Sequence, residues 1–334
     1  MSAEREVRLA DPPPLWIPEL AGAPEGLDRV AKESADRSWG IVVPSIGLTA
    51  PVLDVVRAAI GTSVLRLMRH DAGVRSGNES EDVHQARVAT RRLRSDLLCF
   101  GRILDPAWAA GLRVELGWLG AQLGAVRDAD VLMDRLRASA RELPARDAVV
   151  AERIFERLGA RRDEDRTSLV EVMQSARYLE LLWRLVAASA QPVLRPEAGG
   201  SDPTAVLAKV MQRPWTHLRA AMGALGPDAS DGDLHQARIR AKRVRYAAEA
   251  VAPVFGKRAP EFARAAMELQ RVLGDHQDSV VSAAWLRESS ASDARTAFVA
   301  GELAAAELAA AAAARAAWPA AWKVLARKRL RFWT

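Results

Sequence analysis

The chain has 334 residues, enough for one large or two modest domains, and 49% of them are hydrophobic and 27% charged, as in an ordinary globular protein. The net charge of +6 is only moderately basic, so local clusters of cations matter more than the total. One cysteine, Cys99, excludes an intrachain disulfide and predicts a reducing compartment, where Cys99 would be a small buried side chain. No secretory signal and no uncharged apolar run of about 18 residues is found, so we expect a cytoplasmic protein.

Residues 1–48 differ from the rest of the chain. Prolines interrupt them repeatedly, which predicts an irregular N-terminal segment, with a short strand at residues 39–43.

From residue 49 onward the sequence predicts an all-α fold without βαβ alternation. A Pro- and Gly-rich linker at 191–203 separates a first repeat, 49–190, from a second, 204–334. The helices expected in chain order are 49–75, a motif helix at 83–98, 106–124, 128–142 and 145–190 with a break near Arg177, then 204–224, a second motif helix at 231–254, 258–273, 277–290 and 292–330 divided at Pro319.

The two motif helices carry the same cationic sequence. VHQARVATRRLRSDLL at 83–98 recurs as LHQARIRAKRVRYAAE at 234–249, at a constant offset of 151 residues (235 − 84). On a helix of about 100° per residue the cations gather on one side and the aliphatic residues on the other. No acid lies between each histidine and the last arginine of its run, so we expect these cations to have no carboxylate partner on their own helix. A duplicated cationic face predicts a two-fold-symmetric site for a polyanion.

A second polar feature is also repeated. Gly124 and Asp128 recur as Gly274 and Asp278, at an offset of 150 (274 − 124). Acid–base catalysis needs two acids held together, whereas each copy supplies one. We expect each aspartate to cap the following helix or to orient an arginine of the cationic face.

At this point the sequence resembles the CHAD family of conserved-histidine α-helical domains, whose signature is similar to V/L-H-Q-A-R-V/I-x-x-R/K-R-L/V-R found twice. The resemblance covers about residues 50–330. It implies an all-helical fold of two pseudo-two-fold-related bundles that binds inorganic polyphosphate through a basic groove between the halves. The residues implicated are His84, Arg87, Arg91, Arg92, Arg94, His235, Arg238, Lys242, Arg243 and Arg245. Candidates for additional contacts are Arg57, Arg66, Arg69, Arg127, Arg219 and His276.

Two other classes of function stay open as alternatives. A nucleic-acid-binding module could use the same face, but single-strand binders add aromatic platforms and neither run has an aromatic on its cationic side. A polyphosphate-processing enzyme ranks below it, because no nucleophile or phosphate-loop motif is found. We predict no metal or other cofactor, since residues four positions after His84 and His235 are Val88 and Ile239 and nearby arginines repel a dication. The prediction is a binding protein on polyphosphate granules, with no enzymatic activity.

The C-terminal sequence KVLARKRLRFWT mixes cations with tryptophan and phenylalanine. Two interpretations are open: a helix end packed by its aromatic residues, or an accessory contact to nucleic acid or an anionic surface. We favour packing.

Overall fold

A computed structural model describes residues 39–77, 80–196, 202–226, 228–289 and 293–334. Across these ranges the fold is all-α, with nine α-helices and a short 3-10 helix, which confirms the predicted class. The helices are α2 (Val52–Ser76), α3 (Ser80–Cys99), α4 (Pro106–Ala140), α5 (Ala145–Gln174), α6 (Ala176–Ala190), α7 (Pro203–Ala224), α8 (Asp231–Phe255), α9 (Arg258–Ser289) and α10 (Ala294–Leu325), followed by η2 (Lys328–Leu330).

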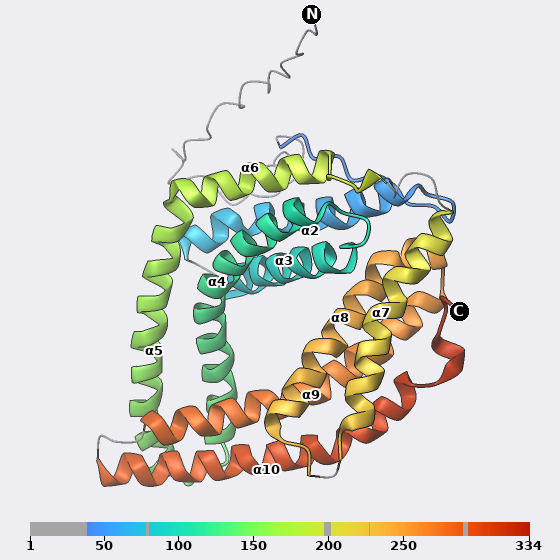
Figure 1. Cartoon of the computed structure of the whole chain (residues 1–334). Coiled ribbons are helices and arrows are strands. Elements are labelled where there is room, and N and C mark those ends of the chain that lie inside the picture. Colours follow the sequence, from blue (N-terminus) through green and yellow to red (C-terminus); the bar gives the residue numbers. More distant parts are fainter. Residues whose placement is uncertain (1–38, 78–79, 197–201, 227, 290–292) are drawn as a thin grey trace, which may run out of the picture.

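The helices form a frame, and α3 and α8 lie on its inner side (Figure 1). Consecutive helices pack on one another from α2 to α5 and again from α7 to α10. The two series meet where α3 contacts α8 and where α10 contacts α5 and α4. Helices from the two series therefore contact each other although they are distant in sequence.

Burial of their apolar faces fixes the orientation of both motif helices. The aliphatic side of α3, including Val83, Leu93 and Leu97, is buried, as is that of α8, including Leu234 and Val244. All five belong to one large core. Each buried Leu or Val contributes roughly 1.5–3 kcal/mol, so the opposite, cationic sides are held facing away from that core.

Several predicted boundaries are wrong. Helix α4 continues through Gly124 and Asp128, and α9 continues through Gly274 and Asp278, where the sequence predicts breaks. Helix α10 also continues through Pro319. Pro319 lies in the C-terminal part of this helix, which ends at Leu325, so the helix contains one residue that donates no backbone hydrogen bond.

Other boundaries follow the sequence. The predicted break near Arg177 lies at Ser175, whose hydroxyl caps α6 by accepting a hydrogen bond from the Tyr178 amide. Residues 39–43 form no strand, and the described part of the linker contributes an isolated bridge between Leu194 and Leu104. The predicted irregular segment at 1–48 lies outside the described residues up to position 38.

The C-terminal aromatic residues pack inward, which confirms the favoured interpretation of the tail. Trp333 lies 5.0 Å from Phe262 between ring centroids and 6.0 Å from Trp215, and Trp322 lies 5.6 Å from Trp215. Phe332 completes the cluster at 5.1 Å from Phe255. The contacts of Trp333 with Phe262 and Trp215 are edge-to-face, a geometry that adds about 0.5–1.5 kcal/mol per pair beyond burial.

Two buried residues complete the description of the core. Cys99 is buried and burial raises the pKa of its thiol to about 12, so the thiol stays protonated.

Helix α10 is long and apolar enough to cross a membrane by length and composition, yet it carries Glu307, which is 2% exposed. Glu307 accepts hydrogen bonds from Arg135 and Ser139 of α4, so this part of α10 is packed against protein.

Candidate functional site

The two motif helices cross in contact, although their sequences lie about 150 residues apart. Arg91 Nε on α3 donates a hydrogen bond to the Tyr246 hydroxyl on α8 over 2.8 Å. Nearby, Cys99 Sγ lies 3.9 Å from the carbonyl oxygen of Arg243. The fold therefore brings the two cationic runs to one place.

Four cations at this crossing, Arg87 and Arg91 from α3 and Arg238 and Lys242 from α8, form what we call the central cluster. The other three cations of the cluster contribute to a lowered pKa of Lys242. Its pKa falls from the ordinary 10.5 to about 7, first because the group is desolvated and then because Arg238, Arg91 and Arg87 repel its charge. Repulsion of this kind acts over short distances, so the cations of both helices share one region.

Each of the outer arginines of the central cluster is held by the repeated glycine and aspartate. Arg87 Nη2 donates to Asp128 over 2.9 Å, and Arg238 Nη2 lies 3.7 Å from Asp278. A Cβ on Gly124 would lie 2.1 Å from Arg87 Nη1, so only glycine leaves the guanidinium room to cross α4. The expectation that each aspartate orients an arginine agrees with these contacts, whereas the capping role is wrong because α4 and α9 continue through the motif.

The same relation is looser in the second copy. A Cβ on Gly274 would lie 3.3 Å from Arg238 Nε, a tight contact rather than a collision. Burial raises the pKa of Asp278, and the neighbouring Arg238, Arg135 and Lys242 act against that rise. Arg87 therefore contacts Gly124 and Asp128 more closely than Arg238 contacts Gly274 and Asp278.

Beside the central cluster lie His84 and Arg127. The pKa of His84 is lowered, by burial first and by the charge of Arg127 second, so Arg127 is a close neighbour of the ring. In the second copy, His235 Nδ1 is buried without a hydrogen-bond partner among the described residues.

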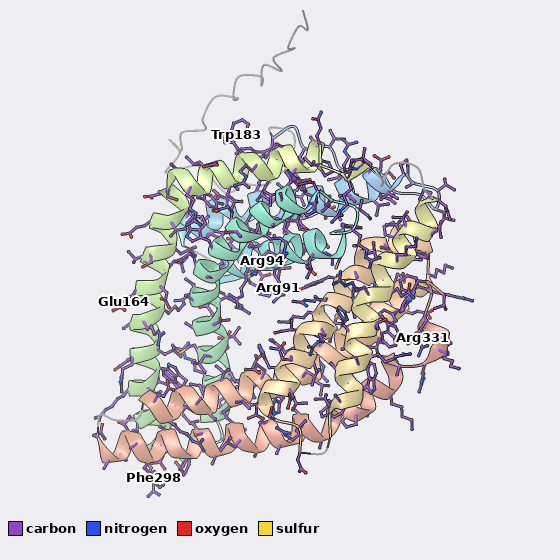
Figure 2. The ribbon with its side chains drawn as sticks, in the orientation of Figure 1. Arg91, Arg94, Glu164, Trp183, Phe298 and Arg331 are labelled. Atoms are coloured by element: carbon purple, nitrogen blue, oxygen red, sulfur yellow. The ribbon has the colours of Figure 1, made fainter. Side chains whose placement is uncertain are left out.

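Arg94 is exposed, and its guanidinium lies beside Gly117 of α4. Figure 2 shows Arg91 and Arg94 on the side of α3 that faces the middle of the frame.

Arg92 and Arg245 contradict the expectation that motif cations lack acids on their own helices. Arg92 Nε donates to Asp96, four residues on, over 3.1 Å, and its Nη1 donates to Glu249 of α8. Arg245 Nε lies 3.5 Å from Glu249, also four residues on. Both acids follow the last arginine of their run, and a search between histidine and last arginine therefore misses them.

Arg92 and Arg245 also lie outside the central cluster. Both guanidinium groups lie over the ring of Tyr246, at 5.1 Å for Arg92 and 4.6 Å for Arg245. Both line a cavity between α2, α3 and α8 that includes Arg66 but no member of the central cluster. The structure therefore divides the motif cations into two groups, separated by Tyr246.

The remaining candidates are scattered. His276 is 2% exposed and its Nε2 lies 3.2 Å from Asp231, so it faces the start of α8 and not an open cationic surface. Arg57 pairs with Asp54 on its own helix at 3.5 Å. Exposed positions are occupied by Arg69, Arg219 and Arg243. Within the described residues, no group of three or more His, Cys, Asp or Glu side chains could hold a metal ion.

The model of the CHAD domain matches residues 58–287, more than half of the chain. The chain belongs to the CHAD domain family. This membership confirms the resemblance drawn from the doubled motif.

Two relatives and two solved structures are similar to this CHAD protein. The uncharacterized proteins MT2285 and Rv2226 of Mycobacterium tuberculosis are 36% identical over 264 residues, which is 75% of this chain and 48% of theirs, so the chain spans about half their length. The crystal structure of the CHAD domain from the plant Ricinus communis has a TM-score of 0.70 at 25% identity, covering 85% of this chain and 95% of that one. PptA from Streptomyces chartreusis has a TM-score of 0.69 at 22% identity, covering 82% and 100%, and shows likeness of fold.

Proposed function

We propose that this chain binds inorganic polyphosphate at the central cluster. The observation that carries the proposal is the contact between the motif helices, where Arg91 of α3 donates to Tyr246 of α8. In keeping with it, desolvation and the charges of Arg238 and Arg91 lower the pKa of Lys242. The resemblance to CHAD proteins supplies the ligand class. A polyanion lying across both helices would neutralise the repulsion that the fold leaves between them.

The chemistry of the cluster suits a chain of phosphates. Arg87 and Arg238 each have one carboxylate partner at the edge of the cluster, while Arg91 and Lys242 have none among the described residues. Guanidinium forks bind phosphate oxygens in pairs, and a lysine adds a compact charge. We infer that His84 becomes protonated beside a bound phosphate and donates a hydrogen bond to it.

Nucleic acid remains the alternative ligand. Bases bind to exposed aromatic rings, but the aromatic residue at the crossing, Tyr246, is 3% exposed, and Arg92 and Arg245 lie over its ring. Polyphosphate has no bases to stack. The central cluster therefore favours polyphosphate, and we propose binding without turnover, with no cofactor.

We also infer that residues 49–190 and 204–334 are copies of one helical unit. The order of packed helices from α2 to α5 repeats from α7 to α10. An arginine of each motif helix reaches an aspartate that lies four residues after a glycine. Two such units facing each other would place equivalent phosphate contacts on both sides of one polyphosphate chain.

In cells the protein would be cytoplasmic and would associate with polyphosphate granules. Imaging a tagged chain in granule-forming cells tests this directly. A diffuse signal that does not change when granules are lost contradicts it.

The binding experiment is a titration of long-chain polyphosphate at two salt concentrations, with single-stranded DNA as competitor. Arg91→Gln and Lys242→Gln each remove one charge from the central cluster, and we expect each to weaken binding and to reduce the salt dependence by roughly one phosphate contact. Arg264→Gln, at an exposed position of α9, is the matched control. Equal affinity in all three variants, or displacement by DNA at equal phosphate concentration, would overturn the proposal.

A further inference from the structure

The cavity between α2, α3 and α8, which we call the outer pocket, is separate from the central cluster. It has a volume of about 460 Å³, within the range of roughly 300–1,000 Å³ of small-molecule sites. Its charged residues are Arg66, Arg92, Arg245 and Glu249. No residue of the central cluster lines it, so the proposed polyphosphate site leaves this pocket without a role.

Three arginines and one glutamate line the outer pocket, and Asp96 pairs with Arg92 from outside the lining, so arginines outnumber the acids that contact them. Arg92 has little freedom, because Asp96 and Glu249 hold it and its side chain is 18% exposed. Arg245 is less well satisfied: its Nε is buried without a hydrogen-bond partner, and Glu249 is 3.5 Å away. The guanidinium of Arg245 therefore keeps hydrogen-bonding capacity that an oxyanion in the pocket could use.

Arg66 is placed to complete such a contact. It is exposed on α2, lines the pocket, and has no acidic partner among the described residues. The guanidinium groups of Arg92 and Arg245, in contrast, both lie over the Tyr246 ring. Arg92 and Arg245 are therefore already in place, and Arg66 can close over a ligand. Together the three guanidinium groups are suited to the several oxygens of a phosphate.

The other walls of the outer pocket are apolar. They comprise Ile46, Val55 and Ala59 on the side of α2 and Val88 and Pro253 on the side of the motif helices. Thr62 and Ser63 add hydroxyl groups beside Arg66. A bare inorganic anion would leave these walls in contact with water, whereas an apolar organic group would bury them.

We propose that the outer pocket binds an organic phosphate monoester, with the phosphate against Arg66, Arg92 and Arg245 and the organic group against the apolar walls. A monoester carries nearly two negative charges at neutral pH, because its second pKa is about 6. The excess of arginines in the lining therefore favours such a dianion. This site goes beyond polyphosphate binding and does not depend on it.

The test uses 4-fluorophenyl phosphate as the probe and ¹⁹F NMR line broadening with the full chain as the measurement. We expect broadening with wild type, reversed by phenyl phosphate and much less by benzoate or inorganic phosphate. Arg66→Gln removes one charged contact at an exposed position and should weaken binding about tenfold. Ala59→Phe fills the pocket and should abolish binding. Arg213→Gln, exposed on α7, is the matched control and should bind as wild type.

Several results would overturn the proposal. The probe could fail to broaden with wild type, or Arg66→Gln and Ala59→Phe could bind it with unchanged affinity. Inorganic phosphate or benzoate could compete as well as phenyl phosphate, which would remove the need for the apolar wall or for the phosphate. Loss of the probe in Arg91→Gln but not in Arg66→Gln would place it in the central cluster. Far-UV circular dichroism shows that each variant is folded, and polyphosphate binding measured on the same variants separates failure of this site from failure of the central one.

Discussion

Arg91 and Tyr246 join the two motif helices: the guanidinium Nε of Arg91 donates to the phenol oxygen over 2.8 Å. The same tyrosine ring lies beneath Arg92 and Arg245 of the outer pocket. Tyr246 thus touches the central cluster with its hydroxyl and the outer pocket with its ring. One buried side chain therefore contacts cations of both motif helices.

The first prediction is that Tyr246→Phe weakens polyphosphate binding. The variant keeps the ring but removes the acceptor for Arg91, and loss of a hydrogen bond to a charged donor should lower the free energy of unfolding by about 1–2 kcal/mol. Tyr178→Phe is the control, because the Tyr178 hydroxyl donates to Asp71 in a buried position away from the central cluster. Urea unfolding should show similar losses for both variants, while polyphosphate titration should show reduced affinity for Tyr246→Phe alone. Equal losses of affinity would mean that Tyr246 acts only through stability.

The second prediction concerns the glycine that Arg87 crosses. In Gly124→Ala the new methyl group would lie 2.1 Å from Arg87 Nη1, so the guanidinium must leave Asp128. Because the displaced atom ends a flexible side chain and alanine favours helix by up to about 1 kcal/mol, the free energy of unfolding should stay near that of wild type. Polyphosphate affinity should nevertheless fall, by up to about tenfold for one misplaced charged contact.

Two further glycines provide the comparison. Gly223→Ala on α7 places the methyl group in open space and should leave affinity unchanged. Gly274→Ala, whose methyl group would lie 3.3 Å from Arg238 Nε, should have an intermediate effect. Unchanged affinity in Gly124→Ala would show that the position of Arg87 does not matter to the ligand.

This glycine also explains where sequence reasoning failed. Glycine inside a helical pattern normally marks a weak point, so Gly124 and Gly274 predict breaks, and Asp128 and Asp278 then resemble caps. In the structure, the absence of a side chain at Gly124 leaves room for Arg87 of the neighbouring helix, and Gly274 does the same for Arg238. Only the packing of α3 on α4 reveals that use.

The motif helices themselves are readable from the sequence, because their aliphatic and cationic residues fall on opposite sides at helical spacing. The division of their cations into two groups is not. It depends on the crossing of α3 with α8, which brings Glu249 to Arg92 and leaves Arg91 with Tyr246. Contacts between residues about 150 positions apart leave no periodic signal in a single sequence.

The third prediction is a pH dependence caused by Lys242. Its folded-state pKa is about 7, below the ordinary 10.5, so between these values the unfolded chain holds the proton more tightly than the folded one. The free energy of unfolding should therefore rise as pH increases through this window, and the full destabilisation is present below about pH 7. Desolvation is the largest cause of this lowered pKa; the charges of Arg238 on α8 and of Arg91 and Arg87 on α3 lower it further, and Asp278 on α9 acts against them.

Lys242→Met keeps most of the side chain but cannot titrate. Urea unfolding at about pH 6 and about pH 9 should show the variant stabilised relative to wild type much more at the lower pH. A bound polyanion favours the charged lysine, so polyphosphate binding by wild type near pH 8 should take up a proton, measurable by calorimetry in buffers of different ionisation enthalpy. A difference between wild type and variant that does not change with pH would refute the assignment.

The fourth prediction tests the buried pair that holds the two halves together at the far side of the frame. Glu307 of α10 is 2% exposed and accepts hydrogen bonds from Arg135 and from Ser139, the latter over 3.0 Å. Arg135→Leu leaves a carboxylate buried without its cation and should lower the free energy of unfolding by about 3–5 kcal/mol. Glu307→Leu should cost less, because the Arg135 side chain is 25% exposed and can turn toward water. The double variant should be more stable than Arg135→Leu alone, since apolar groups replace both charges. A double-mutant cycle by urea unfolding measures the coupling, and strictly additive losses would show that the two charges act independently.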